Sequence, residues 1–226
     1  GQTLVHRARD LGYTVVRTRS ELLTLPAGTT RVLGLFAHDA TFNEMPEEDL
    51  RERGLSAFDD AAPTVAEMTE AALRVLGSPE PGSANTAPRR FLLVVEEEAT
   101  DNFGNNNNAA GVLEAAARAD AAIGVARRHL AANPSTLILT CADSDGGGLR
   151  PIGVWPDDQG RLPEALPAQG SNGAPIDGVG GTGTAPFIAA PDRFGNRLAF
   201  AIAWASRNDL SGGILARAQG LHAERV

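Results

Sequence analysis

Two short segments of the chain hold the side chains that could do chemistry. The first contains Glu96, Asp101 and Asn105, and the second contains Asp143 and Ser144. Carboxylate, amide carbonyl and hydroxyl oxygens suit magnesium, calcium and manganese, whereas zinc favours imidazole and thiolate. These five residues are therefore candidate ligands of a hard divalent cation, and the segments are either a metal site or the remains of one.

Each segment begins where a run of apolar residues ends. The runs at 91–95 and 136–139 both predict short buried strands. In open α/β sheets, ligands bind beyond the carboxyl ends of the strands. The two segments therefore favour a site at one edge of a sheet.

Simpler interpretations of the same residues stay open. The triplet Glu96-Glu97-Glu98 also fits a solvated strand end, and Asn105 to Asn108 also fit a turn, because asparagine tolerates positive φ. The spacing around Asp101 is not that of an EF-hand loop. The glycine-rich run at 178–183 is followed by a predicted strand rather than by a helix, so it is not a dinucleotide-binding loop.

Composition narrows the classes of function. The formal charge of −8 argues against non-specific binding to nucleic acid or to an anionic membrane. A single cysteine, Cys141, excludes an intramolecular disulfide framework and a multi-cysteine zinc site. No apolar run reaches the roughly 18 residues of a transmembrane span. Because the sequence opens with Gly1 and not with Met, we expect either that a leader and more have been removed or that the chain is a piece of a longer protein.

Helix signals are local and clear. Thr64 and Glu67 have capping-box spacing ahead of an apolar face that ends at Gly77, and a second amphipathic stripe runs over 109–131. Shorter helices are expected near 4–11, 18–23 and 209–221. Strands are expected at 13–16, 31–37, 91–95, 136–140, 187–190 and 198–204.

These elements have to position the two polar segments. Strand, helix and strand over 91–140 predict a βαβ unit, and hence a mostly parallel sheet with helices on both faces. No element is assigned to the acidic stretch at 38–62. The Gly- and Pro-rich stretch at 151–186 predicts a lid, an interface arm or a disordered segment.

The scaffold resembles a known family. The tripeptide at 11–13, the run from Arg31 to Ala37 and the segment from Pro63 to Thr69 are similar to the C-terminal half of alkaline phosphatases. The resemblance implies that residues 1–226 form the C-terminal part of one three-layer α/β/α domain, incomplete at its N-terminal side. Residues 151–186 would then be an insertion or loop arm within it.

The resemblance also assigns roles to the retained carboxylates. Glu96 matches the family's magnesium-binding glutamate, and Asp101 matches a zinc-binding aspartate. Asp143 matches the aspartate of the family's Asp-His pair. All three are therefore expected to be metal ligands.

The family's three zinc-binding histidines are replaced. Asn105 and Ser144 stand at two of those positions, and Gly181 or Thr182 stands at the third. The four histidines present lie elsewhere in the sequence and are interpreted as structural or surface residues: His6, His38, His129 and His222. We therefore expect magnesium or calcium, rather than zinc, as the divalent cation held by Glu96, Asp101, Asn105, Asp143 and Ser144.

The resemblance implies a metal-dependent hydrolase of phosphate monoesters, whose nucleophile would lie upstream of this chain. Its substrate would be a small phosphorylated molecule. The alternative is a catalytically inactive relative, serving as a binding or structural component of a cell envelope or an assembly. In a third option, the cation is purely structural and ties the two polar segments together.

Partners and location follow from the same resemblance. An N-terminal part, a partner chain or a second copy in a homodimer is expected to cover the open sheet edge. Nucleic acid is not an expected partner. The expected location is the bacterial periplasm, the cell envelope or the extracellular medium.

Overall fold

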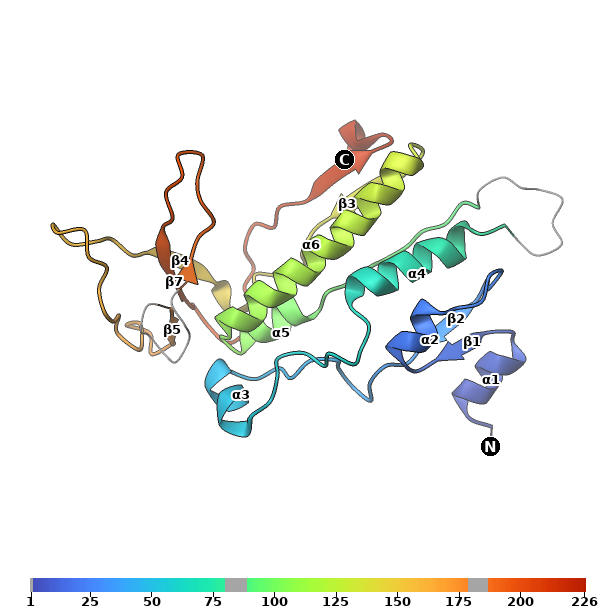
Figure 1. The fold of residues 1–226 in the computed structure, drawn as a ribbon, viewed down its shortest axis with the longest axis horizontal. Coiled ribbons are helices and arrows are strands. Elements are labelled where there is room, and N and C mark those ends of the chain that lie inside the picture. The colour runs from blue at the N-terminus through green and yellow to red at the C-terminus, as the bar shows by residue number, and fades with distance from the viewer. Residues whose placement is uncertain (1, 80–88, 179–186) are drawn as a thin grey trace.

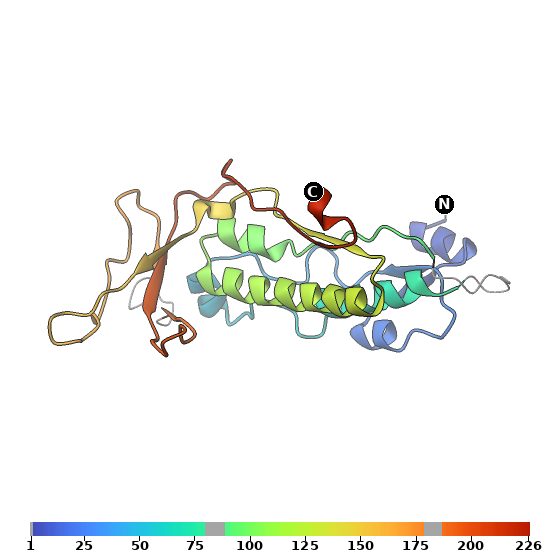
Figure 2. The same cartoon turned by 90° about the horizontal axis from the view of Figure 1, so that it is seen from above.

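The computed structural model describes residues 2–79, 89–178 and 187–226. The described chain is elongated, with a helical body between a small N-terminal unit and a β-rich arm (Figures 1 and 2). Among the described residues, none of the helices combines the length and hydropathy that a membrane crossing requires.

The helical body is built on α6 (Ala109–Ala132) and α4 (Val65–Gly77), which pack against each other (Figure 1). Both helices confirm the sequence prediction. Asn108 caps α6 by accepting a hydrogen bond from the Gly111 N–H at 2.6 Å. The α4 capping box is also present, since Thr64 and Glu67 each accept from the backbone N–H of the other.

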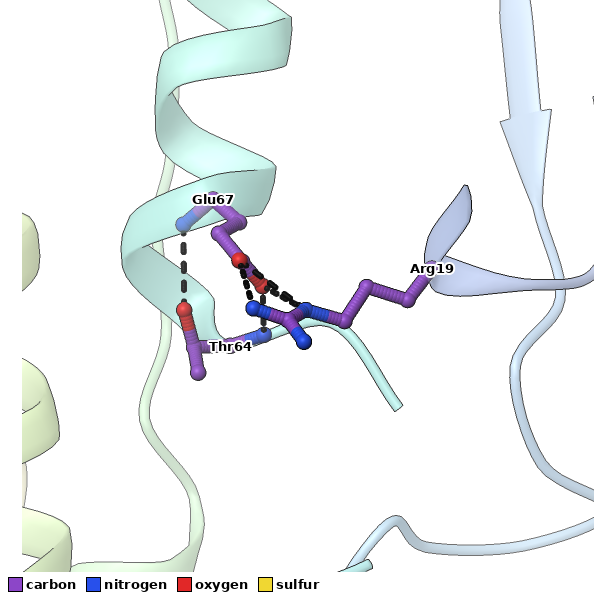
Figure 3. Close-up of polar contacts among 3 residues, drawn as sticks. All are labelled: Arg19, Thr64 and Glu67. Atoms are coloured by element: carbon purple, nitrogen blue, oxygen red, sulfur yellow. Dashed lines mark hydrogen bonds and ion pairs between the residues drawn. The ribbon is translucent and has the colours of Figure 1, made fainter. Parts of the chain in front are cut away.

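The N-terminal unit comprises α1 (Leu4–Asp10), β1 (Thr14–Val16), α2 (Arg19–Leu23) and β2 (Val32–Gly34). Strands β1 and β2 pair in parallel, and Val16 and Leu22 pack with Val75 of α4. Arg19 also holds Glu67 in a two-pronged ion pair, with Nη2–Oε1 at 2.6 Å (Figure 3). The N-terminal unit is therefore held against α4 both near its start, at Glu67, and near its end, at Val75.

Helix α3 (Glu47–Arg53) lies within the acidic stretch to which no element was assigned. Its first turn holds three acidic residues, its last turn holds two arginines, and Gly54 ends it with φ of 64°. These are ordinary signals of helix start and stop. Beyond α3, Phe58 packs with Phe42 and Phe103 in an aromatic cluster with ring centroids 5.6–6.1 Å apart.

The arm is an antiparallel sheet around β7 (Ala199–Ala203). This strand pairs with β4 (Arg150–Gly153), β5 (Ile176–Asp177) and β6 (Phe187–Ile188). The Gly- and Pro-rich stretch thus contributes β4 and β5. Between them, residues 154–175 form no helix or strand, while 179–186 lie outside the described residues.

The prediction of a mostly parallel sheet with helices on both faces is wrong for the described residues. Their sheets are small, and apart from β1–β2 the pairings are antiparallel. Strand β3 (Leu137–Thr140) pairs antiparallel with β8 (Arg217–Gly220). The fold is therefore mixed α/β with several small sheets.

The expected strand at 91–95 is also wrong, because residues 89–97 form no helix or strand. Leu92 is 88% exposed and Val94 is 79% exposed. A strand needs a neighbouring backbone to accept its hydrogen bonds, and this run pairs with no strand in the described part of the chain. The apolar composition of this run indicated burial, but composition alone does not provide a neighbouring strand to pair with.

The expected helix at 209–221 is wrong as well. Within this range the chain forms β8, and a single 3-10 turn, η2 (Ala223–Arg225), follows it. Gly212 and Gly213 interrupt the helical period, since glycine weakens a helix interior. Pairing with β3 then fixes the extended conformation.

Candidate functional site

The two polar segments meet where α5 (Ala99–Asn105) packs on η1 (Gly146–Gly148). Gly147 makes this close approach possible. Its φ is +66°, and a Cβ built there would lie 2.1 Å from the Gly104 carbonyl oxygen. Only glycine suits this backbone conformation at this distance.

Asp101 and Asn105 lie one turn apart on the same face of α5. The Asn105 Nδ2 group donates to Asp101 Oδ1 at 3.2 Å and to Oδ2 at 3.1 Å. From the second segment, Ser144 Oγ donates to Asp101 Oδ1 at 3.3 Å. Asp101 is therefore in direct contact with two of the other predicted ligands, Asn105 and Ser144.

Asp209 is a member of this cluster that sequence reasoning missed. It follows β7, and its Oδ1 accepts from Asn105 Nδ2 at 2.7 Å. A polar residue beyond an apolar strand was the signal that marked the first two segments, and Asp209 lies just beyond the apolar run at 198–204. The expectation of a helix starting at 209 concealed it.

Electrostatics links the carboxylates further. Burial, followed by the proximity of Asp209, raises the pKa of Asp101 to about 6. The pKa of Asp209 is lowered, first because the Asn105 amide donates to it. The two carboxylates therefore act as a pair in which Asp101 takes up a proton more readily.

Glu96 and Asp143 lie at the edge of the same acidic surface. Both are exposed, and both raise the pKa of Glu98, after burial as the main cause. Glu98 in turn raises the pKa of Asp101. The predicted acidic ligands thus share one region of negative potential, and Glu98 belongs to it too.

The third vacated histidine position was assigned to Gly181 or Thr182, and these residues lie outside the described part of the chain. In the described part of the chain, Asn105 and Ser144 contact Asp101, and the next side chain to join this cluster is Asp209, through Asn105. Within the described ranges, the one trio of carboxylates with ligand atoms within 4.8 Å of one another is a different group, Glu47, Glu48 and Asp177. Asp177 is fully buried and accepts from Trp204 Nε1 at 2.7 Å.

The donor set decides which cation could suit the α5–η1 site. Asp101, Ser144 and Asp209 offer carboxylate and hydroxyl oxygens and no imidazole. Such donors do not fit a histidine-bound zinc pair, whereas they fit magnesium, calcium or manganese. The chemistry of the cluster therefore favours a hard cation over zinc.

Comparisons with known proteins connect this site to a family. A family model described as alkaline phosphatase matches residues 1–155. No curated protein matches the chain in sequence.

Solved structures of three bacterial enzymes are similar in fold. The alkaline phosphatase of the Antarctic bacterium TAB5 is 16% identical with a TM-score of 0.59, over 99% of this chain and 49% of that one. A Shewanella sp. enzyme is 19% identical with a TM-score of 0.58, over 100% and 58%. The Thermus thermophilus enzyme is 28% identical with a TM-score of 0.51, over 68% and 29%.

The chain spans less than two thirds of each of these enzymes, so it corresponds to part of their fold. The family match covers more than half of the chain, from α1 through β4. That match includes α5, η1 and four contacting residues of the site: Asp101, Asn105, Ser144 and Gly147. The chain belongs to the alkaline phosphatase family.

Proposed function

We propose that this chain is the C-terminal part of a metal-dependent hydrolase of phosphate monoesters that uses an oxygen-ligated cation. The observation that carries the proposal is the convergence of Asp101, Ser144 and Asp209 from three separate segments. Alkaline phosphatases are metal-dependent, and carboxylates gathered in this way attract a divalent cation.

The proposed ligands are Asp101, Asp143, Ser144 and Asp209, with Glu96 at the exposed edge. Magnesium or calcium is the proposed cation. A structurally similar TAB5 variant, with glutamate in place of a histidine, has magnesium bound in its M3 site. A bound cation would supply charge stabilisation for a phosphoryl group.

The remaining functions of the enzyme are proposed to come from outside the chain. The nucleophile would belong to an N-terminal part or a partner chain, and the substrate would be a small phosphorylated molecule. We propose that residues 1–226 act as one unit, with 151–186 as an arm that contacts a second copy or another partner. A periplasmic, envelope or extracellular location is proposed and can be checked by cell fractionation.

The test is hydrolysis of p-nitrophenyl phosphate by the full-length protein with Mg²⁺, Ca²⁺, Mn²⁺ or Zn²⁺. We expect turnover with an oxygen-preferring cation, and at least a tenfold loss in Asp209→Asn. Asp10→Asn, on exposed α1, is the matched control and should keep full activity. No turnover with any of the cations would refute the enzymatic proposal.

One observation favours the second candidate, a non-catalytic binding or structural component. The Asn105 amide donates hydrogen bonds to both Asp101 and Asp209, which offsets part of their repulsion without a metal. Metal analysis of the purified protein separates the two candidates. Stoichiometric metal supports the hydrolase, and a metal-free protein supports the structural role.

A further inference from the structure

The Asn105 side chain has hydrogen bonds on both ends of its amide. Its Oδ1 accepts from the Gly147 N–H at 3.0 Å. Its Nδ2 donates to Asp209 at 2.7 Å and to both oxygens of Asp101. One side chain therefore joins α5, η1 and the segment after β7.

The partners fix which end of the amide faces which group. A backbone N–H can only donate, and ionised carboxylates can only accept, so Oδ1 must face Gly147 and Nδ2 must face the two acids. Gly147 cannot move away easily, since it packs against Gly104. The carbonyl oxygen that could bind a cation is therefore directed toward the backbone of η1.

We propose that Asn105 is a positioning residue that holds Asp101 and Asp209 together in place of a cation, and that it does not ligate the metal. This inference rests on the proposed function, because it concerns the same site. Two carboxylates this close repel each other, and an N–H donor shared between them offsets that repulsion. A cation that binds both acids has to displace the Nδ2 group.

The two roles of Asn105 predict opposite effects of its removal. If the amide takes the place of a cation, Asn105→Ala destabilises the metal-free protein and leaves the affinity for Mn²⁺ equal or higher. If Asn105 is a ligand, Asn105→Ala weakens Mn²⁺ binding about tenfold or more, as loss of a direct ligand would. Asn105→Asp, which adds a carboxylate, should raise Mn²⁺ affinity further in the first case.

The experiment uses the full chain, first in chelator and then with added Mn²⁺. Thermal unfolding gives the melting temperature of each metal-free variant, and calorimetric titration gives its affinity for Mn²⁺. We expect Asn105→Ala to lower the metal-free melting temperature by several degrees. Added Mn²⁺ should then raise the melting temperature of this variant by more than it raises that of the wild type. Asn106→Ala is the matched control, because the Asn106 side chain donates to the Asn102 carbonyl within its own helix.

A further pair of variants tests the dependence on Asp209. In an Asp209→Ala background one of the two charges is gone, so removal of the Asn105 amide should cost clearly less than in the wild type. A general packing role would give the same cost in both backgrounds. Equal costs would therefore overturn the proposal.

Two other outcomes are also decisive. Weaker Mn²⁺ binding by Asn105→Ala, with an unchanged metal-free melting temperature, would overturn the inference and leave the proposed metal site intact. If the wild type binds no Mn²⁺ but Asn105→Ala is destabilised in an Asp209-dependent way, the inference holds and the proposed function fails. Should Asn105→Ala not fold, proton exchange of the wild-type Asn105 side-chain amide still tests the inference, since unchanged protection of both amide protons in Asp209→Ala would contradict a bond to each acid.

Discussion

At the scale of single residues, the site has few hydrogen-bond donors and many carboxylate acceptors. Asp101 receives hydrogen bonds from Asn105 and Ser144, while Glu98 and Asp209 add negative charge around it. Its pKa is raised to about 6, mainly by burial and next by Asp209. The folded chain therefore binds a proton here more tightly than the unfolded chain does.

This raised pKa predicts a direction for stability against pH. Because the folded pKa of Asp101 lies above its usual value of 3.8, its contribution to stability should grow as the pH falls through about 6 toward 4. Urea unfolding in chelator between pH 7.5 and 5 measures this slope. Asp101→Asn should flatten it, and an unchanged slope in that variant would contradict the assignment.

A second residue-scale prediction concerns the buried pair in the arm. Asp177 is 0% exposed and Trp204 is 3% exposed, and they share a 2.7 Å hydrogen bond. Asp177→Ala leaves the buried indole N–H without this acceptor, which should cost about 2 kcal/mol of the free energy of unfolding. Exposed Asp158→Ala should change it little, and a loss of similar size in both variants would argue against this bond as the cause.

At the scale of elements, helices whose signals lie within their own sequence could be predicted. The span from Thr64 to Gly77 carries its cap, its apolar face and its end, so α4 forms as expected. The run at 91–95 and β3 both looked like strands of one sheet, but strand pairing depends on distant partners. Only β3 has one in the described chain, and this partner is β8, whose own sequence favoured a helix.

The residues of the candidate site also differ in whether the sequence could predict them. Asp101, Asn105 and Ser144 could be assigned to one site from the family resemblance, although helix α5, which holds the first two, was not predicted. Asp209 could not be added, because its contact with Asn105 depends on the path taken by the chain after β7. The direction of the Asn105 amide depends on its contact with Gly147, so the sequence could not predict it either.

A prediction at this scale follows from the start of α4. Thr64→Ala removes the side-chain cap of a helix that also anchors Arg19 through Glu67, and should cost about 1 kcal/mol of the free energy of unfolding. Chemical denaturation measures the loss. Thr64→Ser retains the hydroxyl, so it should recover most of the stability; no recovery would point to the lost methyl group instead.

At the scale of the whole molecule, the described chain leaves large apolar side chains in solvent. Leu92 and Val94 are the most exposed of these in the run at 89–97, and Leu139 on β3 is 57% exposed. Large apolar side chains gathered in solvent often mark an interface. It agrees with the finding that the chain spans 49% of the TAB5 enzyme.

We therefore expect the chain by itself to self-associate through this surface. Leu92→Glu with Val94→Glu should lower light scattering and shift the chain toward monomer in size-exclusion chromatography. Leu4→Glu, on the equally solvent-exposed α1, is the control for added charge and should have less effect. Unchanged scattering in the double variant would show that this surface does not drive association.

The contact between Gly104 and Gly147 has a consequence for mutational scanning. A Cβ at Gly147 would lie 2.1 Å from one atom of Gly104, and a Cβ at Gly104 would lie 2.7 Å from the carbonyl oxygen of Gly146. A scan of all substitutions should therefore find both glycines nearly intolerant of change. Ranked by tolerance alone, these two positions would pass for catalytic residues, although Gly104 is required only to leave space and Gly147 only to leave space and adopt its positive φ.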